Sequence, residues 1–469
     1  MALWIEVEQE DRYTKAMNYT HAAFPGAPVR AKELDYLVTH LRAGWCCAVV
    51  GPSNTGKSFL LKSLLMEEVV QRCTKTGWPA PIIVFIDCLE AGDSEHAFYE
   101  LLLRRTIETL AYHDDAAPIL ASLRQFHHQM LQPGPSEVAI RALYASSVRM
   151  ICQQHQGQLI LILDEFYDVF QHLPPWPFRQ LRALHDDLQP QLSFVTATSH
   201  FLENLRPDPA VYEFRELFQL HTLMLDPLSP ADAQILITYL ADRHSETVSP
   251  ENRQRLIDLS GGHPGLLERI YEIATLIQID KLAPLDITPA ELINLPPVQK
   301  ECQRLWNELE AEQAGLLALL PGQPMALTPQ QQSLLSRKGL MTAVDGSSPQ
   351  IFSPVLAQFI ETTYGGQMEA EQGAGVRVDA GTGQIFVGED EVTLKLSEPQ
   401  RKLIQFLCDR VGTVCSYDDI AIGVWGIGEG VSPGAIYELV KRVRQKIEPD
   451  WKQPRYIVTV PGKGYRLEP

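Results

Sequence analysis

The sequence predicts an α/β fold for the first half of the chain, followed by smaller helical units. Short apolar runs alternate with longer segments in which apolar residues recur at helical spacing. The strand-like runs are apolar throughout, which is typical of parallel strands covered by helices on both faces. The length of 469 residues, 45% of them hydrophobic, is enough for about two to four domains with buried cores. We therefore expect a multidomain protein whose first domain is α/β.

The first domain is predicted to contain one leading helix and several strands. Residues 30–44 show helical spacing of apolar residues, and Gly44 is expected to end this helix. Apolar runs predict strands at 45–50 (WCCAVV), 82–87 (IIVFID), 159–165 (LILILDE) and 192–199 (LSFVTATS). We assign residues 29–225 to this domain and residues 1–28 to a leader.

Beyond residue 225 the strand-like runs fade and helical patterns take over. Ser229 is the predicted N-cap of the first of these helices. A smaller unit follows, in which helical segments precede a short hairpin. The stretch GGQMEAEQGAG after this unit lacks apolar periodicity, which is typical of a linker. The predicted boundaries are 226–298 for the helical region, 299–364 for the smaller unit, 365–375 for the linker and 376–469 for a final domain.

The strongest local motif is GPSNTGKS at residues 51–58, which fits GxxxxGK[ST] and lies between a predicted strand and a predicted helix. In such a loop the glycines let backbone N–H groups and the helix N-terminus face a phosphate. Lys57 would reach the β- and γ-phosphates, and the Ser58 hydroxyl would bind Mg²⁺. The sequence thus predicts a site for ATP or ADP with Mg²⁺. The predicted nucleotide contacts here are Gly51, Pro52, Ser53, Asn54, Thr55, Gly56, Lys57, Ser58 and Phe59.

An acidic pair, Asp164 and Glu165, ends the apolar run LILILDE. A metal-dependent NTPase needs carboxylates at this place, because one binds Mg²⁺ and another activates the attacking water. We predict the metal role for Asp164 and the role of catalytic base for Glu165. The alternative interpretation is that the pair only caps the following helix.

Polar residues after the next predicted strand are further catalytic candidates. Thr198 ends the run LSFVTAT, where its hydroxyl could sense the γ-phosphate. Arg206 and Arg215 follow, and either could act as an arginine finger toward the nucleotide of a neighbouring subunit. The alternatives are a strand that simply ends in a hydroxyl and arginines that lie on the surface.

Together these motifs resemble the STAND and AAA-type signal-transduction ATPases, which are close to the origin-recognition ATPases. The resemblance covers residues 29–364 and rests on GPSNTGKS, LILILDE, Thr198 and the later SGGHPGLL. It implies a P-loop core, a helical lid and a winged helix after the lid.

Two looser boxes of the same family assign further residues to the nucleotide site. Gly262-His263-Pro264 is similar to the family's GxP motif, which implies that Pro264 lies in the lid near the nucleotide base. PVRAKEL is similar to the family's N-terminal box, which implies that Arg30 belongs to the site.

The final domain has the element order of a winged helix-turn-helix. A β-like start precedes a helix capped by Ser397, a second helix begins near Tyr417, and a third covers 432–447. YIVTVPGKGYRL then predicts two short strands around a glycine turn. In this arrangement the third helix enters a major groove while the hairpin contacts the backbone of duplex DNA.

Charge is distributed unevenly between this domain and the rest. The net charge of −18 excludes a protein that coats nucleic acid or anionic membrane through a broad basic surface. Residues 376–469 are neutral, however, and residues 431–469 hold eight basic and four acidic side chains. The alternative for such a basic run is a solvated helix face. The predicted DNA contacts are Lys441, Arg442, Arg444 and Lys446 on the helix and Lys463 at the wing tip.

The segments LSEPQRKLIQFL, DDIAIGVWG, AIYELVKRVRQKI and YIVTVPGKGYRL resemble the OmpR/PhoB-type output domain of response regulators. This resemblance implies that Arg442 and Arg444 contact DNA in or beside the groove and that Thr459 contacts the backbone. The predicted fold class is therefore an α/β P-loop NTPase core with a helical lid, followed by two winged-helix domains.

Cysteine use and the N-terminus indicate a cytoplasmic protein. The eight cysteines are scattered without a CxxC pair, as is typical of a reducing compartment. The start MALWIEVEQED lacks the order of a signal peptide, and the longest apolar runs are shorter than the ~18 residues of a membrane span. We predict a protein of the bacterial cytoplasm or nucleoid with no membrane partner.

The function predicted from these domains is an ATP-dependent switch that binds double-stranded DNA and regulates transcription, with slow Mg²⁺-dependent ATP hydrolysis. We also expect homo-oligomers on ATP binding. Because no separate sensor domain is visible, either a signalling protein delivers the signal as a partner or the nucleotide itself is the signal. One alternative is a DNA-bound loader or adaptor of AAA type. Another is a defence or stress sensor of STAND type whose terminal domain binds protein.

Overall fold

A computed structural model describes residues 29–113, 117–277, 284–321, 327–342, 348–365, 376–379, 382–388, 390–426, 431–452, 454–460 and 463–468. The predicted leader, 1–28, and residues 366–375 of the predicted linker lie outside this part of the chain. Contacts divide the chain into two compact units, with the division between Phe359 and Ile360.

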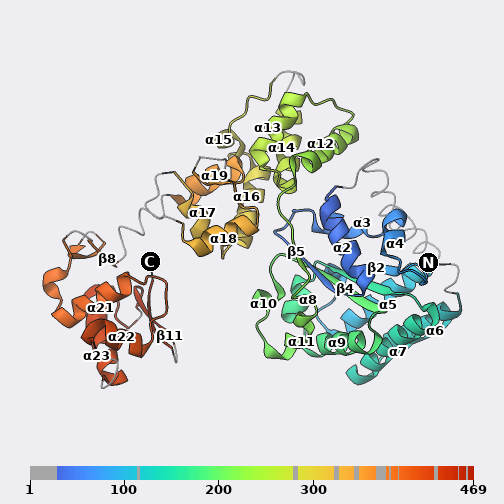
Figure 1. Cartoon of the computed structure of the whole chain (residues 1–469), viewed down its shortest axis with the longest axis horizontal. Helices are drawn as coiled ribbons and strands as arrows, with labels where there is room; N and C mark the ends of the chain where they lie inside the picture. The colour runs from blue at the N-terminus through green and yellow to red at the C-terminus, as the bar shows by residue number, and fades with distance from the viewer. Residues whose placement is uncertain are drawn as a thin grey trace. The chain divides into compact units, whose positions relative to one another are not determined.

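The first unit contains a sheet that has five strands within the described residues, and all neighbouring strands are parallel. The strand order is β2-β3-β4-β1-β5. Figure 1 labels β2, β4 and β5 of this sheet. The strands are β1 (Cys47–Val50), β2 (Ile82–Asp87), β3 (Leu159–Asp164), β4 (Leu192–Thr198) and β5 (Thr222–Met224). The four strands predicted from apolar runs are confirmed, whereas β5 is an edge strand that the sequence analysis missed.

Helices cover both faces of this sheet, because alternate side chains of each strand fill two separate apolar cores. Ile160 and Ile162 of β3 belong to the core beneath α2 (Ala31–Ala43), α3 (Lys57–Ser63) and α4 (Glu67–Cys73). Leu161 and Leu163 belong to the core on the opposite face. The helices on that face are α5 (Glu95–Leu110), α6 (Ala117–Leu131), α7 (Glu137–His155), α8 (Tyr167–His172), α9 (Trp176–Leu188), α10 (Leu202–Leu205) and α11 (Tyr212–Glu216).

After β5 the first unit continues as helices. The predicted cap at Ser229 is confirmed, since its side chain accepts a hydrogen bond from the backbone of Asp232. The helical lid consists of α12 (Pro230–His244), α13 (Pro250–Ser260) and α14 (Pro264–Ile277). The smaller unit follows the lid with helices before a hairpin, in the predicted order. Helix α15 (Pro289–Leu292) lies between the lid and this unit, within the predicted range 226–298. The elements of the smaller unit are α16 (Pro296–Glu308), α17 (Gln313–Ala318), α18 (Pro329–Arg337), β6 (Met341–Thr342), β7 (Gln350–Ile351) and α19 (Pro354–Ile360).

The second unit is a winged helix with its own apolar core. Ile436, Val440, Val443 and Ile447 of its third helix face this core, which leaves the other side of that helix to solvent. The elements are β8 (Val376–Val378), β9 (Ile385–Val387), β10 (Asp390–Glu391), α21 (Glu398–Cys408), α22 (Tyr417–Trp425), α23 (Pro433–Ile447), β11 (Ile457–Val460) and β12 (Gly464–Leu467). Over the described ranges of both units, no helix is long and apolar enough to cross a membrane.

Candidate functional site

The loop between β1 and α3 has the geometry of a phosphate-binding loop. Asn54 (φ 60°) and Gly56 (φ 91°) both lie in the left-handed region, which turns the backbone so that α3 begins at Lys57. Gly56 is the N-cap of α3, and no side chain of the described structure caps this helix end. The first N–H groups of α3 therefore remain for an anion in the loop.

Lys57 is buried at the base of this loop, with 5% of its surface exposed. Its Nζ donates hydrogen bonds to the carbonyl oxygens of Gly51, at 2.7 Å, and Pro52, at 3.0 Å. Burial lowers the pKa of Lys57, and nearby carboxylates oppose this effect. The carboxylates are those of Glu165, Glu308 and Asp164.

The two carboxylates predicted for catalysis lie at the carboxyl end of β3. Asp164 is 3% exposed, and its Oδ1 has no hydrogen-bond partner among the described residues. Burial raises the pKa of Asp164, and a hydrogen bond from Ser58 opposes this rise. Glu165 has φ 50°, a strained conformation for a residue with a side chain and one that is common at functional sites. Burial raises the pKa of Glu165, against the effect of Lys57.

Asp87 is a third carboxylate at this edge of the sheet, and the sequence analysis did not single it out. It ends β2 in register with Asp164 on the neighbouring β3. One of its oxygens accepts a hydrogen bond from the backbone N–H of Leu89 at 3.1 Å. Its charge also raises the pKa of Asp164 and Glu165. The signal was available, because the run IIVFID ends in an aspartate just as LILILD does.

Ser58 and Asp164 fit a magnesium ion. A hydroxyl and a carboxylate are the hard oxygen ligands that Mg²⁺ prefers, and the Oδ1 atom of Asp164 is buried without a partner in the described structure. In the described ranges no group of three or more His, Cys, Asp or Glu residues could hold a metal by itself. A magnesium ion here would therefore need phosphate oxygens and water to complete its coordination.

Arg30 connects the loop to the segments that follow β5. It is 2% exposed, and its Nη2 donates to the carbonyl oxygens of Thr55, at 2.9 Å, and Asp226, at 2.7 Å. Its backbone N–H donates to the carboxylate of Asp232 in α12 at 3.0 Å. Burial lowers the pKa of the Arg30 guanidinium. The residue assigned by the N-terminal box thus contacts both the loop and the start of the lid.

The turn Gly262-His263-Pro264 brings the lid to the loop. Pro264 is the first residue of α14, and Gly265 donates its N–H to the carbonyl oxygen of Asn54 at 3.1 Å. A Cβ atom at Gly265 would lie 2.7 Å from the Cβ atom of Asn54, so only glycine allows this approach. Pro264 therefore lies next to a loop contact, and its packing against a nucleotide base stays a prediction.

His263 is a buried neutral histidine behind the loop, with 2% of its surface exposed. Its Nδ1 accepts a hydrogen bond from the backbone N–H of Leu266 at 3.2 Å, which caps α14. Its Nε2 has no partner among the residues that the structure describes. Burial, together with the charges of Arg30 and Lys57, lowers the pKa of His263 to about 3.

Helix α16 also reaches the loop, through two carboxylates that the sequence analysis did not single out. The Nδ2 of Asn54 donates to both carboxylate oxygens of Glu301, at 2.9 and 3.0 Å. The backbone N–H of Ser53 donates to Oε2 of Glu308 at 2.5 Å. The partners are 247 and 255 residues apart in the chain, so no local pattern could have predicted these contacts.

The other predicted catalytic residues make hydrogen bonds within the chain. Thr198 ends β4, and its Oγ1 donates to the carbonyl oxygen of His200 at 2.7 Å. Arg215 is 9% exposed and donates from Nη1 to the carbonyl oxygen of Arg206 at 3.0 Å. The Arg206 guanidinium in turn donates to carbonyl oxygens at the end of α8. To act as fingers, both arginines would have to leave these contacts, and that role stays a prediction.

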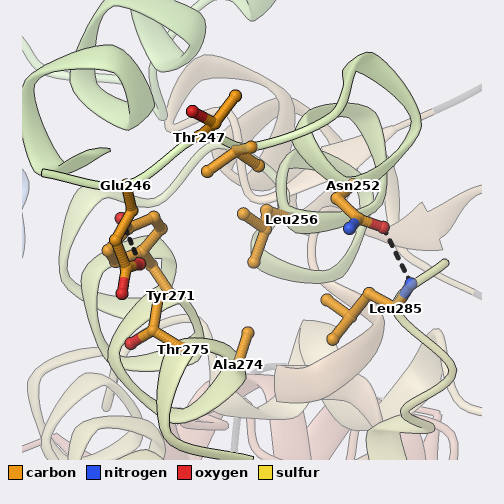
Figure 2. Close-up of a pocket in the computed structure, with 9 residues that line it drawn as sticks. Glu246, Thr247, Asn252, Leu256, Tyr271, Ala274, Thr275 and Leu285 are labelled. Atoms are coloured by element: carbon orange, nitrogen blue, oxygen red, sulfur yellow. Dashed lines mark hydrogen bonds between the residues drawn. The ribbon is translucent and has the colours of Figure 1, made fainter. Parts of the chain in front are cut away.

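A pocket in the lid shares no residue with this site (Figure 2). Tyr271 lines it and donates from its hydroxyl to Glu246 at 3.2 Å, while the side-chain oxygen of Asn252 accepts from the N–H of Leu285 at 2.7 Å. The described lining includes no basic residue. The described lining of this pocket therefore offers a phosphate no positively charged side chain.

In the second unit, three of the predicted DNA contacts, Arg444, Lys446 and Thr459, also connect the elements of the winged helix. Arg444 of α23 donates from Nε to the carbonyl oxygen of Ile457 at 2.9 Å and from Nη2 to Oγ1 of Thr459 at 2.9 Å. Burial lowers the pKa of Arg444. The Nζ of Lys446 donates to the side chain of Gln400 in α21 at 2.7 Å. A DNA contact by either cation would compete with these bonds.

Accessibility differs among the predicted basic contacts, and Lys446 is itself exposed although its Nζ is bonded. Arg442 is exposed on α23 and makes no hydrogen bond or ion pair with the described residues. Lys441 is half-buried, and its Nζ lies 3.6 Å from Oε1 of Glu438. Lys463 is exposed at the turn between β11 and β12. Of the predicted basic contacts on α23, Arg442 is the one best placed to meet a phosphate.

Comparisons with known proteins divide the chain in the same way. The model of the family Novel STAND NTPase 1 matches residues 22–272, which is more than half of the chain. The family model described as Transcriptional regulatory protein, C terminal, matches residues 390–467. Both resemblances inferred from the motifs are thereby confirmed.

Curated relatives match the second unit. The transcriptional regulatory protein YvrH of Bacillus subtilis is 35% identical over 86 residues, which is 18% of this chain and 35% of the relative. The sensory transduction protein RegX3 of Mycobacterium tuberculosis is 34% identical over 110 residues, which is 22% of this chain and 48% of the relative. This chain thus spans less than half the length of either relative.

Solved structures resemble both parts of the chain at low identity. The Walker-type ATPase of Pyrococcus abyssi is 16% identical over 71% of this chain and 95% of its own, with a TM-score of 0.43. The Aeropyrum pernix ORC2 protein is 14% identical, and the match covers 74% of this chain and 96% of the ORC2 chain, with a TM-score of 0.41. The DNA-binding domain of Klebsiella pneumoniae RstA, solved in complex with the RstA box, is 21% identical. The match covers 20% of this chain and 91% of the RstA chain, with a TM-score of 0.19.

The phosphate-binding loop with its carboxylates therefore lies in a recognised NTPase domain, and the winged helix lies in a recognised regulator domain. The chain belongs to the Novel STAND NTPase 1 family, and its C-terminal winged helix matches the family model of the C-terminal domain of transcriptional regulatory proteins.

Proposed function

We propose that this protein is an ATP-dependent switch that binds duplex DNA through its winged helix and regulates transcription. The observation that carries the proposal is that one loop contacts three parts of the first unit. Through Arg30, Gly265 and Glu308, the loop touches the segment after β5, the lid and α16. A ligand that binds in the loop would therefore act directly on these three elements.

ATP with Mg²⁺ supplies the switch with a γ-phosphate that is present before hydrolysis and absent after it. Lys57 would exchange its two carbonyl acceptors for phosphate oxygens, while Ser58 and Asp164 would hold the metal. Glu165 would accept a proton from the attacking water, and the rise of its pKa by burial makes it a stronger base. We expect slow hydrolysis, because a switch needs its triphosphate form to persist.

The second unit provides the output in this proposal. Helix α23 would enter the major groove, with Arg442 on a phosphate and Lys463 of the wing on the adjacent backbone. The curated relatives that match this unit are transcriptional or sensory transduction regulators, which favours sequence-specific binding. We propose a cytoplasmic location, since the partner is DNA. A homo-oligomer on ATP binding and a signalling protein remain further proposed partners.

Genome-wide capture of DNA bound to the full chain, with and without ATP, tests the proposal, and Lys57→Ala serves as the nucleotide-blind control. We expect a limited set of sites whose occupancy depends on ATP in the parent protein and not in the variant. Large ATP-dependent oligomers on any DNA sequence would instead support a loader. A folded protein that binds no DNA at low salt would support a terminal domain that binds protein.

A further inference from the structure

The exposed side of α23 is acidic and polar along its middle and basic only at its two flanks. Four residues at helical spacing fix the side that faces the core, namely Ile436, Val440, Val443 and Ile447. At about 100° per residue, Glu438 and Gln445 lie on the opposite side of the helix, and both are exposed. Lys441 and Arg442 lie about 50° to either side of that line. The side chains that would reach deepest into a groove are therefore not cations.

Glu438 brings a negative charge to the face of α23 that would meet DNA. Its Oε1 lies 3.6 Å from Nζ of Lys441, and half of its side-chain surface is exposed. An ion pair this open to water stabilises a helix little, so folding alone does not account for the carboxylate. Near DNA phosphates a carboxylate is unfavourable unless it accepts a hydrogen bond there. A duplex that suits this helix must therefore offer a donor at the position of Glu438.

Base edges in the major groove offer such a donor in only two ways. Cytosine exposes its N4 amino group and adenine its N6 amino group. Adenine also places its N7 acceptor beside the amino group, and that acceptor repels a carboxylate, whereas cytosine has no acceptor at this edge. A carboxylate on the groove-facing line of α23 therefore favours cytosine.

We propose that Glu438 determines the specificity of the second unit by accepting a hydrogen bond from N4 of a cytosine in the bound duplex. The inference rests on the proposed function and deepens it, because it names a feature of the DNA that is selected. Any other base leaves the carboxylate without its donor, and an unpaired charge at an interface is more unfavourable than the loss of one contact. Glu438 thus acts mainly by rejecting wrong sequences.

Lys441 complements this role. Its Nζ lies 5.9 Å from the ring centroid of Trp451 and beside the Glu438 carboxylate, so two neighbours hold it at the flank of the groove-facing line. The guanine that pairs with the selected cytosine exposes the acceptors O6 and N7. An acceptor and a donor 3.6 Å apart on α23 thus match the donor and the acceptors that one C·G pair presents.

Selection of random duplexes by the full-length protein with ATP, followed by sequencing of the bound DNA, tests the proposal with Glu438→Gln. Glutamine keeps the size of the side chain, removes its charge and pairs with N6 and N7 of adenine. We expect one position of the parental motif to prefer cytosine about tenfold and the variant to prefer adenine there. Glu398→Gln removes the same charge from an exposed glutamate of α21 and should keep the parental motif.

Binding curves give an independent measurement of the same preference. Replacing the selected C·G pair by T·A should weaken binding of the parent protein about tenfold and of Glu438→Gln by less than about threefold. An unrelated duplex should bind Glu438→Gln about threefold more tightly than the parent, because a negative charge has left the face that meets DNA.

The outcomes separate this inference from the proposed function. The same cytosine preference in parent and Glu438→Gln would overturn the role of Glu438 and leave DNA binding intact. A parental motif without any such cytosine would overturn it as well. If the folded parent protein binds no duplex, with ATP or without it, the proposed function itself is contradicted.

Discussion

In the candidate nucleotide site of the first unit, Lys57, Asp164 and His263 are between 2% and 5% exposed, whereas Arg442 lies exposed on α23 of the second unit. Buried charges interact strongly and shift one another's pKa, while exposed charges are screened by water and salt. We therefore expect single substitutions in the first region to have large effects on binding, catalysis or stability. In the second region, the effects should be smaller and should depend on salt.

The largest effect is expected from Lys57→Ala. Removing a buried cation that would face the phosphates should weaken ATP binding at least about a hundredfold. Titration calorimetry of the purified protein measures this loss, and Lys75→Ala, a lysine outside the loop, is the control. Retained affinity in Lys57→Ala would show that the buried region does not bind phosphate, and the contrast between the two regions would then disappear.

Glu165→Gln should separate binding from chemistry. The variant should keep ATP affinity within about threefold, while single-turnover phosphate release slows about a hundredfold, because a general base contributes roughly that factor. Asp168→Asn, which changes an exposed carboxylate of α8, should leave the rate unchanged. Normal turnover in Glu165→Gln would remove this residue from the mechanism and leave its left-handed backbone without a catalytic explanation.

His263 makes stability depend on pH. Its pKa of about 3 in the folded protein lies below the ordinary value of 6.5, so only the unfolded chain gains a proton as the pH falls through 6.5. The stabilising effect is therefore complete above pH 6.5 and decreases toward pH 3, with about 2 kcal/mol lost by pH 5. Thermal unfolding at pH 7.5 and pH 5 measures this decrease.

His263→Asn provides the comparison for that measurement. Asparagine keeps an acceptor near the position of Nδ1 for the N–H of Leu266, and it does not titrate in this range. Between pH 7.5 and pH 5, the melting temperature of the variant should fall by less than that of the parent protein. An identical decrease in both proteins would assign the pH dependence to other groups.

The smallest effect is expected on α23, where Arg442 and Arg444 can be separated. Arg442→Ala should weaken DNA binding about fivefold and reduce the salt dependence by ~0.9 log unit, with no change in melting temperature. Arg444→Ala should also lower the melting temperature, because this side chain bonds the carbonyl oxygen of Ile457 and the hydroxyl of Thr459. Binding curves at several salt concentrations measure the DNA affinity of each variant and its salt dependence. Unchanged affinity in both variants would contradict the recognition-helix assignment.

Local sequence was enough to predict the sheet and the loop, because each depends on neighbouring residues. A buried strand needs a run such as LILIL, and a phosphate loop needs glycines at set spacing. β5 was missed because Thr222–Met224 is a three-residue edge strand, too short to show a pattern. The contacts of Glu301 and Glu308 with the loop depend on the packing of distant helices, which no local pattern records.

The basic residues of α23 show a different limit of prediction from sequence. Arg442 and Arg444 look alike in the segment KRVRQK, yet one is exposed and the other bonds the wing. The difference follows from their positions around the helix. Arg444, next to the core residue Val443, lies on the side of α23 that meets β11, whereas Arg442 lies on the exposed side. Counting charge predicts that a basic surface exists but does not show which cations are available to DNA.

The bond from the backbone of Arg30 to Asp232 joins residues that are 202 positions apart. Strand β1, which leads into the phosphate loop, lies between β4 and β5, so the loop has its place in the sheet only after Met224 has been made. At a synthesis rate of about 5–20 residues per second, Glu308 at the end of α16 follows Met224 some 4–17 s later. For most of that interval α16 does not yet cover the loop. We therefore expect a newly made chain to meet cellular nucleotide before it first closes, so that its initial state reflects the nucleotide pool at the time of translation.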